Sequence, residues 1–361
     1  MLSFIGVGIS GYKSISDHIL EVLNRCKVIY LERFTGFISE NELQEVYSLG
    51  DRHGCNLTIL PVERSFVEDG RVILEQAQLG NVALLTYGDP FIATTLMELY
   101  VRAIKRGIEV NVIHAASGIT SLIGEAGLHL YKFGRMVTIM SEPTSSLSVY
   151  NTLFENLLGK NHTLILTEYR REDSGDPVFL CPNSAFNALL QTEEDFEYKV
   201  FSKDTFAIVA SRIGLPGKKI ISGKVSSLIG LTFGQGPHSI IITGPLHFTE
   251  IEALKTLTQN LDEPVDNTAN IQNLSACMIA RYVPKARCAL ANMRVVCRSD
   301  DPSDLEILDN AARYIDDAER FLRQGKDETA VLSIGYAEGL IDALRFRTGV
   351  DPWEYDSQPP E

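Results

Sequence analysis

The chain of 361 residues is 45% hydrophobic and 22% charged, and its formal net charge is -14 at pH 7. These values are close to globular averages, so they exclude a disordered or low-complexity chain and allow two or three domains. No signal-like segment opens the sequence, and no apolar run reaches the roughly 18 residues of a membrane span, so we expect a cytoplasmic protein without membrane contact. The acidic balance also argues against nucleic acid as a direct ligand.

The six cysteines form neither a CxxC pair nor a cluster with histidine. Zinc sites and redox dithiols both need such spacing. We therefore expect no metal centre.

Residues 1–115 alternate short apolar strands with amphipathic helices, as in a mostly parallel sheet covered by helices on both faces. The expected strands are 2–7, 28–31, 56–60, 82–86 and 110–113, and the expected helices are 16–25, 72–78 and 96–106. A second series follows in residues 116–260, with expected strands at 136–141, 162–167, 206–210 and 239–243 and a helix at 183–191. The fold class is therefore α/β, with two lobes in tandem.

Residues 261–361 follow a different pattern. A polar, turn-rich linker is expected at 262–273, and after it the apolar residues recur at helical spacing. Two amphipathic helices, at 305–322 and 331–344, are separated by Gly325, and a further helix is expected at 277–297. From residue 301 onward there are 15 acidic and 6 basic residues, a net charge of -9. We expect an acidic, all-helical third domain.

Residues 84–95, LLTYGDPFIATT, form the most informative segment. A buried strand runs into Gly88-Asp89-Pro90 and then into a hydroxyl-rich helix start. In an open α/β sheet, ligands bind at the carboxyl ends of strands, and such a loop suits a ligand. The same residues also serve an ordinary turn with Asp and Thr as caps, so the segment alone does not decide between the two.

Residues 6–11, GVGISG, match the dinucleotide-binding pattern GxGxxG, and Glu32 ends the next strand as that pattern requires. This favours an NAD enzyme. However, Ser14 or Ser16 is the better helix cap, so Gly11 would lie outside the helix and a pyrophosphate would lack its helix N-terminus. The dinucleotide interpretation is therefore a remote alternative.

Several motifs together carry more information than any one of them. They are LSFIGVGIS, VIYLERFTG, LLTYGDPFIATT, VIHAASG, GLHLYKFG, HTLILTEYR, IVASRIG and PHSIIITGPLH. In this order they resemble the diphthine synthases, which belong to the tetrapyrrole-methylase class of S-adenosylmethionine methyltransferases. The resemblance covers residues 1–255.

The resemblance implies a fold and a reaction. S-adenosylmethionine is expected to lie in a cleft between the two lobes and to leave as S-adenosylhomocysteine. The expected acceptor is the amine of a 3-amino-3-carboxypropyl group on a histidine of translation elongation factor 2, a protein modification in diphthamide biosynthesis. Carried over by matching motif, the expected cofactor contacts are Ile9, Asp89, Ile92, Ser117, Gly118, Thr167, Ile213 and His238.

Each contact has a structural alternative. Asp89 would hold polar parts of the cofactor or cap a helix, the isoleucines would pack on the cofactor or in the core, and His238 would donate a hydrogen bond or lie on the surface. Relatives commonly have Ser-Ile where this chain has Ser117-Gly118-Ile119, so the contact is Gly118 or Ile119. At Thr167 relatives often carry aspartate.

Methyl transfer is an in-line displacement that depends mainly on alignment, so a neutral amine suffices as nucleophile. No spacing in the sequence identifies a general base. The candidates are His114, His129 and His247, and the simpler interpretation is that they are structural residues.

The resemblance also implies a homodimer, and the helical tail resembles a small archaeal domain, which suggests an archaeal source. The tail either docks a partner such as the elongation factor or stabilises the enzyme or its dimer. Two other functions stay open: methylation of a tetrapyrrole such as a precorrin, and cofactor binding without activity.

Overall fold

The computed structural model describes residues 1–11, 15–36, 44–46, 58–171, 177–269, 274–297 and 302–353. The chain divides into two compact units, Met1–Ile271 and Gln272–Glu361, which are described separately. Within the described residues, no helix combines the length and the apolar character needed to cross a membrane.

The first lobe contains a five-stranded sheet in the order β3-β2-β4-β1-β5, and every neighbouring pair is parallel. This confirms the predicted parallel sheet. The strands are β1 (Leu2–Gly6), β2 (Val28–Glu32), β3 (Ile59–Val62), β4 (Val82–Thr86) and β5 (Val110–Ile113). Its helices are α1 (Asp17–Leu23), α4 (Arg64–Asp69), α5 (Arg71–Leu79) and α6 (Leu96–Lys105). Residues 56 and 57, expected to begin the third strand, lie outside the described residues.

Local chemistry explains several of these boundaries. The Ser16 side chain accepts a hydrogen bond from the Ile19 amide and caps α1, so the cap is one of the two serines that the sequence offered. Gly107, with φ of 70°, follows α6 where a left-handed residue is needed. All five residues of β1 and of β4 are buried, as expected for central parallel strands.

The second lobe differs from the first, because its six-stranded sheet is mixed. The order is β13-β11-β10-β12-β7-β6, and β10 pairs antiparallel with both β11 and β12. The strands are β6 (Val137–Ile139), β7 (Thr163–Thr167), β10 (Phe206–Ser211), β11 (Lys219–Lys224), β12 (His238–Ile242) and β13 (Gln259–Asn260). The sequence did not predict β11, because KIISGK begins and ends with lysine and contains a glycine.

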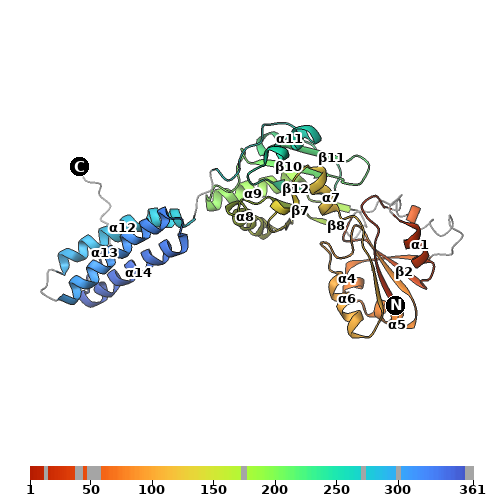
Figure 1. The fold of residues 1–361 in the computed structure, drawn as a ribbon, viewed down its shortest axis with the longest axis horizontal. Helices are drawn as coiled ribbons and strands as arrows, with labels where there is room; N and C mark the ends of the chain where they lie inside the picture. The colour runs from red at the N-terminus through yellow and green to blue at the C-terminus, as the bar shows by residue number, and fades with distance from the viewer. Residues whose placement is uncertain are drawn as a thin grey trace. The chain divides into compact units, whose positions relative to one another are not determined.

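Helices and a small hairpin complete this lobe (Figure 1). They are α7 (Gly118–Glu125), the 3-10 turn η2 (Leu130–Lys132), α8 (Pro143–Leu158), β8 (Tyr169–Arg171), β9 (Pro177–Phe179), α9 (Pro182–Phe196), α10 (Val225–Leu228) and α11 (Phe248–Leu257). Leu122 and Ile123 of α7 pack into a core with Leu164 and Phe206. The second lobe therefore begins at α7.

The segment predicted as a linker at 262–273 is partly anchored to this lobe. The Asn267 side chain donates hydrogen bonds to the carbonyl oxygens of Phe206 and Thr243, each at about 2.9 Å or less, and accepts one from the Phe206 amide. These bonds satisfy backbone groups of the first residue of β10 and of the residue that follows β12. Residues up to 269 thus belong structurally to the first unit.

In its described residues, 274–297 and 302–353, the second unit consists of three helices, which confirms the predicted helical region. They are α12 (Leu274–Val296), α13 (Pro302–Arg323) and α14 (Asp327–Thr348), and they share one apolar core. Gly325, with φ of 69°, lies in the turn between α13 and α14. Negative charge is confined to part of the bundle: α12 contains four basic and no acidic residues. Its Arg287 and Arg294 pair with Asp316 and Asp309 of α13 at 2.8 and 3.0 Å.

Candidate functional site

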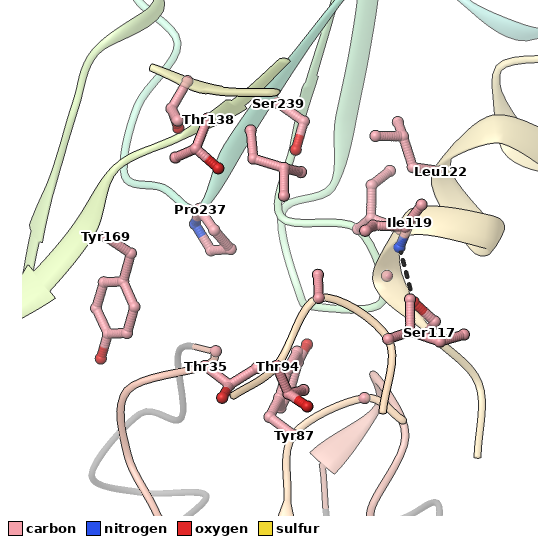
Figure 2. A pocket seen from close by; sticks show the side chains of 18 of the residues that line it. Thr35, Tyr87, Thr94, Ser117, Ile119, Leu122, Thr138, Tyr169, Pro237 and Ser239 are labelled. Carbon is pink, nitrogen blue, oxygen red and sulfur yellow. Dashed lines mark hydrogen bonds between the residues drawn. The ribbon is translucent and has the colours of Figure 1, made fainter. Parts of the chain in front are cut away.

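A cavity of about 300 Å³ lies between the two lobes of the first unit, beyond the carboxyl ends of β2 and β4. Clefts of this size and position are typical of small-molecule sites. Figure 2 shows side chains from both lobes around it. The lining residues are 34–36, 64, 87–89, 92–95, 117–119, 122, 138, 166, 167, 169, 210, 212, 213 and 237–239.

The glycine-rich start of the chain holds the loop after β4 in place. The Gly8 amide donates to the Gly88 carbonyl at 3.2 Å, and the Gly88 amide donates to the Gly8 carbonyl at 2.9 Å. Gly88 has φ of 77°, and a Cβ on Gly6 would lie 2.5 Å from the Gly88 carbonyl oxygen. The glycine-rich segment at residues 6–11 and the loop with Gly88 therefore contact each other through their backbones beside the cavity.

This geometry does not form a dinucleotide site. Helix α1 begins only at Asp17, so Gly11 is not at a helix N-terminus. Glu32, the acidic residue that the dinucleotide pattern requires at the end of the next strand, is fully buried and accepts the amides of Phe34 and Thr35 at 2.9 and 2.8 Å. Burial raises the pKa of Glu32. Its carboxyl shapes the turn at one wall of the cavity.

Asp89 lies at the cavity wall with 5% of its surface exposed, and protein donors occupy both of its carboxylate oxygens. Oδ1 accepts the Phe91 amide at 2.9 Å. Oδ2 lies 2.8 Å from His114 Nδ1 and accepts the Ala115 amide at 3.3 Å. Asp89 therefore joins the loop after β4 to the loop after β5. This structural role differs from the helix cap that the sequence offered as the alternative, because the N-cap of α6 is Thr95.

Ser117 and Gly118 form the N-terminus of α7 at the cavity. The Ser117 hydroxyl accepts the Ile119 amide at 3.2 Å and caps the helix (Figure 2). Gly118 and Ile119 both line the cavity, so both of the alternatives predicted for this contact lie at the site. Gly118 is half-buried, and a Cβ added to it would meet no atom closer than 3.9 Å, so its backbone leaves room for a ligand.

Replacing Ser117 by alanine is expected to lower the free energy of unfolding by about 1 kcal/mol, because the first turn of α7 loses its cap. Chemical denaturation measures this change. Ser121→Ala in the same helix is the matched control, since alanine is the better helix former there and we expect no loss. Equal stability of Ser117→Ala and the native chain would show that the cap is unimportant.

Thr167 and His238 lie side by side on β7 and β12, and both line the cavity. The Thr167 hydroxyl donates to the His238 carbonyl at 2.8 Å. The His238 ring is 5% exposed, and its Nδ1 lies 2.8 Å from the Ser211 hydroxyl. Burial lowers the pKa of His238, so the ring is neutral at pH 7. The side chain thus packs into the sheet rather than lying on the surface.

The three predicted isoleucines differ in placement. Ile92 and Ile213 line the cavity, and Ile92 is 40% exposed, which places it at the opening rather than in the core. Ile9 is buried and is not a lining residue, but its carbonyl accepts the Tyr87 hydroxyl at 2.8 Å. The Ile9 backbone therefore holds the hydroxyl of Tyr87, which itself lines the cavity. The structure brings together all the predicted contacts except Ile9.

Sequence reasoning missed several lining residues. Some lie within quoted motifs, and proximity to the predicted contacts is the signal for them: Phe34, Thr35, Gly36, Tyr87, Thr94, Thr95 and Tyr169. Others come from positions without any motif and carry no sequence signal: Arg64, Leu122 and Thr138. Tyr169 reaches across from the second lobe, and its hydroxyl donates to the Arg33 carbonyl at 3.4 Å.

The three candidate histidines serve other contacts. His114 pairs with Asp89, whereas His129 and His247 both lie within hydrogen-bond distance of the Thr249 hydroxyl, at 3.2 and 2.8 Å. None of the three is among the described residues that line the cavity. The geometry therefore assigns no general base to them.

Comparison with known proteins agrees with this architecture. Residues 1–229 match the family model of tetrapyrrole (corrin/porphyrin) methylases. The diphthine synthase of Methanocaldococcus jannaschii is 34% identical over 264 residues, which are 72% of this chain and 100% of that protein. The diphthine synthase of Methanothermobacter thermautotrophicus is 32% identical, covering 70% of this chain and 94% of that protein.

A solved structure shows the same fold. The crystal structure of a protein from Entamoeba histolytica, provisionally named a diphthine synthase, superposes with a TM-score of 0.62 at 31% identity. It covers 71% of this chain and 98% of that one. The helical unit is an addition to this common core, and residues 281–349 match a family described as a protein of unknown function (DUF357). The chain therefore belongs to the tetrapyrrole methylase family and, within it, to the diphthine synthases, which are S-adenosylmethionine-dependent methyltransferases.

Proposed function

We propose that the cavity between the lobes binds S-adenosylmethionine, and that the methyl acceptor is the amine of a 3-amino-3-carboxypropyl-histidine on translation elongation factor 2. One observation carries the proposal of cofactor binding. The loop after β4, the N-terminus of α7 and the strand ends of the second lobe all line one cavity. The second part rests on the diphthine synthase relatives.

The residues present fit the cofactor. Apolar side chains of Ile92, Ile119 and Ile213 suit an adenine ring, and the hydroxyls of Thr94 and Thr138 suit ribose and amino-acid groups. A Cβ added to Gly88 would have no atom closer than 3.9 Å, so the glycine leaves its backbone open to a ligand. Such a mixture of apolar walls and hydroxyl groups suits a molecule that is polar at one end and aromatic at the other.

When bound, S-adenosylmethionine supplies an electrophilic methyl group. The protein's own contribution is alignment and exclusion of water, because a neutral amine attacks without assistance. Asp89 holds the loop after β4, and Ser117 holds the first turn of α7, so the two walls keep their spacing. The predicted contacts Asp89, Ser117 and His238 act in this proposal mainly through the backbone that they position.

Arg64 and Arg212 line the cavity and bring positive charge to it. The proposed acceptor carries a carboxylate, which an arginine binds well. The Arg212 guanidinium is held by the carbonyls of Pro216 and Gly236 at 2.8 and 3.1 Å, and the Arg64 guanidinium lies 5.1 Å from the Phe34 ring centroid. Arg212 is thus held near the cavity by hydrogen bonds, whereas the Arg64 side chain is more exposed and also lies 3.8 Å from the Glu68 carboxylate.

Labelled methyl transfer tests the proposal. The full chain is incubated with methyl-labelled S-adenosylmethionine and elongation factor 2 that carries the carboxypropyl-histidine, and we expect label on that protein. Elongation factor 2 without the modification is the matched control and should remain unlabelled. Label only on a precorrin would contradict the proposed acceptor, and cofactor binding without any transfer would indicate a binding protein. The homodimer, the cytoplasmic location and the archaeal source remain predictions.

A further inference from the structure

Helix α14 exposes an apolar face to solvent between Leu332 and Phe346. Leu332, Tyr336 and Phe346 are 70%, 58% and 76% exposed. At 100° per residue they lie on one stripe, opposite the buried side of the helix. The residues of this α14 face are Leu332, Gly335, Tyr336, Gly339, Ala343 and Phe346. A continuous apolar stripe of this kind marks an interaction surface.

The two glycines of the α14 face are not required by the bundle. A Cβ built on Gly335 or Gly339 would meet no atom within 4 Å, and neither has a positive φ. Glycine in the middle of a helix is destabilising relative to alanine. The two glycines within the 22 residues of α14 therefore lower the stability of the helical unit taken by itself. Such small residues allow a second helix backbone to approach closely.

We propose that the α14 face binds the α14 face of a second copy of this chain, with the two helices antiparallel. A two-fold axis between Ala337 and Glu338 places Tyr336 of each copy opposite Gly339 of the other. The same axis places Leu332 opposite Ala343. Each large side chain thus meets a small one, as an isologous interface requires.

Charge follows the same symmetry. The axis places the exposed Glu328 opposite Arg347 of the second copy. Arg347 also pairs with Asp304 of its own chain, so the interface would extend an existing ion pair. A parallel arrangement would instead bring like charges together at both ends of α14, which is unfavourable. Charge complementarity therefore selects a second, antiparallel copy as the occupant.

The size of the face sets the expected strength. A helix of 22 residues is about 33 Å long, so one helix pair buries less than the roughly 800 Å² per partner of a standard interface. Tyr314 of α13, whose ring centroid lies 4.9 Å from that of Tyr336, widens the face. We expect a reversible, concentration-dependent association. This inference does not depend on the methyl acceptor.

Sedimentation of the full chain over a concentration series tests the proposal. We expect Gly339→Arg to raise the dissociation constant of one association step at least about tenfold, the equivalent of 1.4 kcal/mol. Arginine is a good helix former, and circular dichroism verifies the fold of the variant. Ala291→Arg, at an exposed position of α12, is the matched control and should associate like the native chain. If the first unit also self-associates, Gly339→Arg still removes the α14 step.

Disulfide trapping tests the register. An equal mixture of Leu332→Cys and Ala343→Cys chains should form a mixed disulfide dimer beyond the background of native cysteines. Leu332→Cys alone should not, because the two copies of residue 332 would lie about 16 Å apart along the helix axis. Identical association of Gly339→Arg and the native chain, absence of self-association in the native chain, or cross-linking of Leu332→Cys with itself would each overturn the proposal.

Discussion

Replacing Asp89 by alanine is expected to lower kcat/KM for methyl transfer by about 100-fold, which corresponds to about 2.7 kcal/mol. The carboxylate accepts the amides of Phe91 and Ala115 and contacts His114 in a nearly closed site. Alanine leaves the partly buried amides of Phe91 and Ala115 without this partner, at up to about 1–3 kcal/mol for each. The loop after β4, which carries Ile92, then loses its fixed position at the cavity.

Three variants define the measurement. In Asp89→Asn the amide oxygen still accepts the Phe91 amide, but the amide nitrogen stands where Oδ2 accepted the Ala115 amide and contacted His114. One of the two backbone amides keeps its acceptor, so we expect a smaller loss of kcat/KM than in Asp89→Ala. Asp69→Ala is the control, because that aspartate is exposed and pairs with the exposed Arg71. Steady-state kinetics and calorimetric titration with S-adenosylmethionine separate transfer from binding. Native kcat/KM and native cofactor affinity in Asp89→Ala would contradict the positioning role.

Replacing Glu250 by alanine is expected to lower the free energy of unfolding of the first unit by about 3–5 kcal/mol. Glu250 is fully buried at the start of α11. It contacts His162 Nε2 at 3.1 Å, pairs with Lys132, and accepts the amides of His129 and His247 at 3.0 and 2.8 Å. Its removal leaves two amides without an acceptor and leaves the partly buried Lys132 ammonium without its carboxylate, with the Pro245 carbonyl still accepting a hydrogen bond from it.

Glu252→Ala is the matched control, because Glu252 is exposed on the same helix and its loss should change stability by less than about 0.5 kcal/mol. Trp353, the single tryptophan, lies in the second unit, so its fluorescence does not report on this network. Hydrogen exchange of the amides of β7 and α11 measures the effect locally. Equal protection in Glu250→Ala and Glu252→Ala would contradict the prediction.

The same network predicts how stability depends on pH. Burial by itself would raise the pKa of Glu250, but the Lys132 ammonium and hydrogen bonds from its neighbours lower it to about 2. Because the folded pKa lies below the ordinary 4.5, this stabilisation is present above pH 4.5 and is lost as the pH falls toward 2. Burial also lowers the pKa of His162, so its contribution is complete above pH 6.5 and is lost as the pH falls through its folded value.

Denaturation at a series of pH values measures this dependence. The native chain should lose stability steadily below pH 6.5, and Glu250→Ala should show a shallower slope between pH 4.5 and 2. Parallel slopes for the two proteins would show that Glu250 does not carry the acid sensitivity.

Some features were predictable because they depend on residues close together in the chain. The predicted strand at 82–86 and the predicted strand at 110–113 agree with β4 and β5, and Ser16 caps α1 as expected. The helical spacing of 305–322 and 331–344 likewise predicted α13 and α14. Alternation and helical periodicity are local patterns, so a single sequence reveals them.

The second sheet was less predictable, since its order depends on pairing between distant strands. Nothing in the residues of β10 indicates that it pairs antiparallel with β12. The paired residues Ser211 and His238 are 27 residues apart along the chain. Strand β11 carries too few apolar residues to be recognised without its partner. The net charge of -9 predicted for the tail covers only residues from 301 onward, so it leaves out the basic helix α12. This helix pairs with the acidic side of α13.

The sequence by itself determined the family, the succession of lobes and seven of the residues that line the cavity, because motifs keep their order along the chain whatever their partners are. The tertiary structure alone decided what those residues do. Asp89 and Ser117 hold protein amides, Glu32 shapes a turn, and Ile9 lies behind Tyr87 instead of at the cavity. The physical reason is that a hydrogen-bonding group in a closed space must find its partner there, and which partner it finds depends on residues distant in sequence.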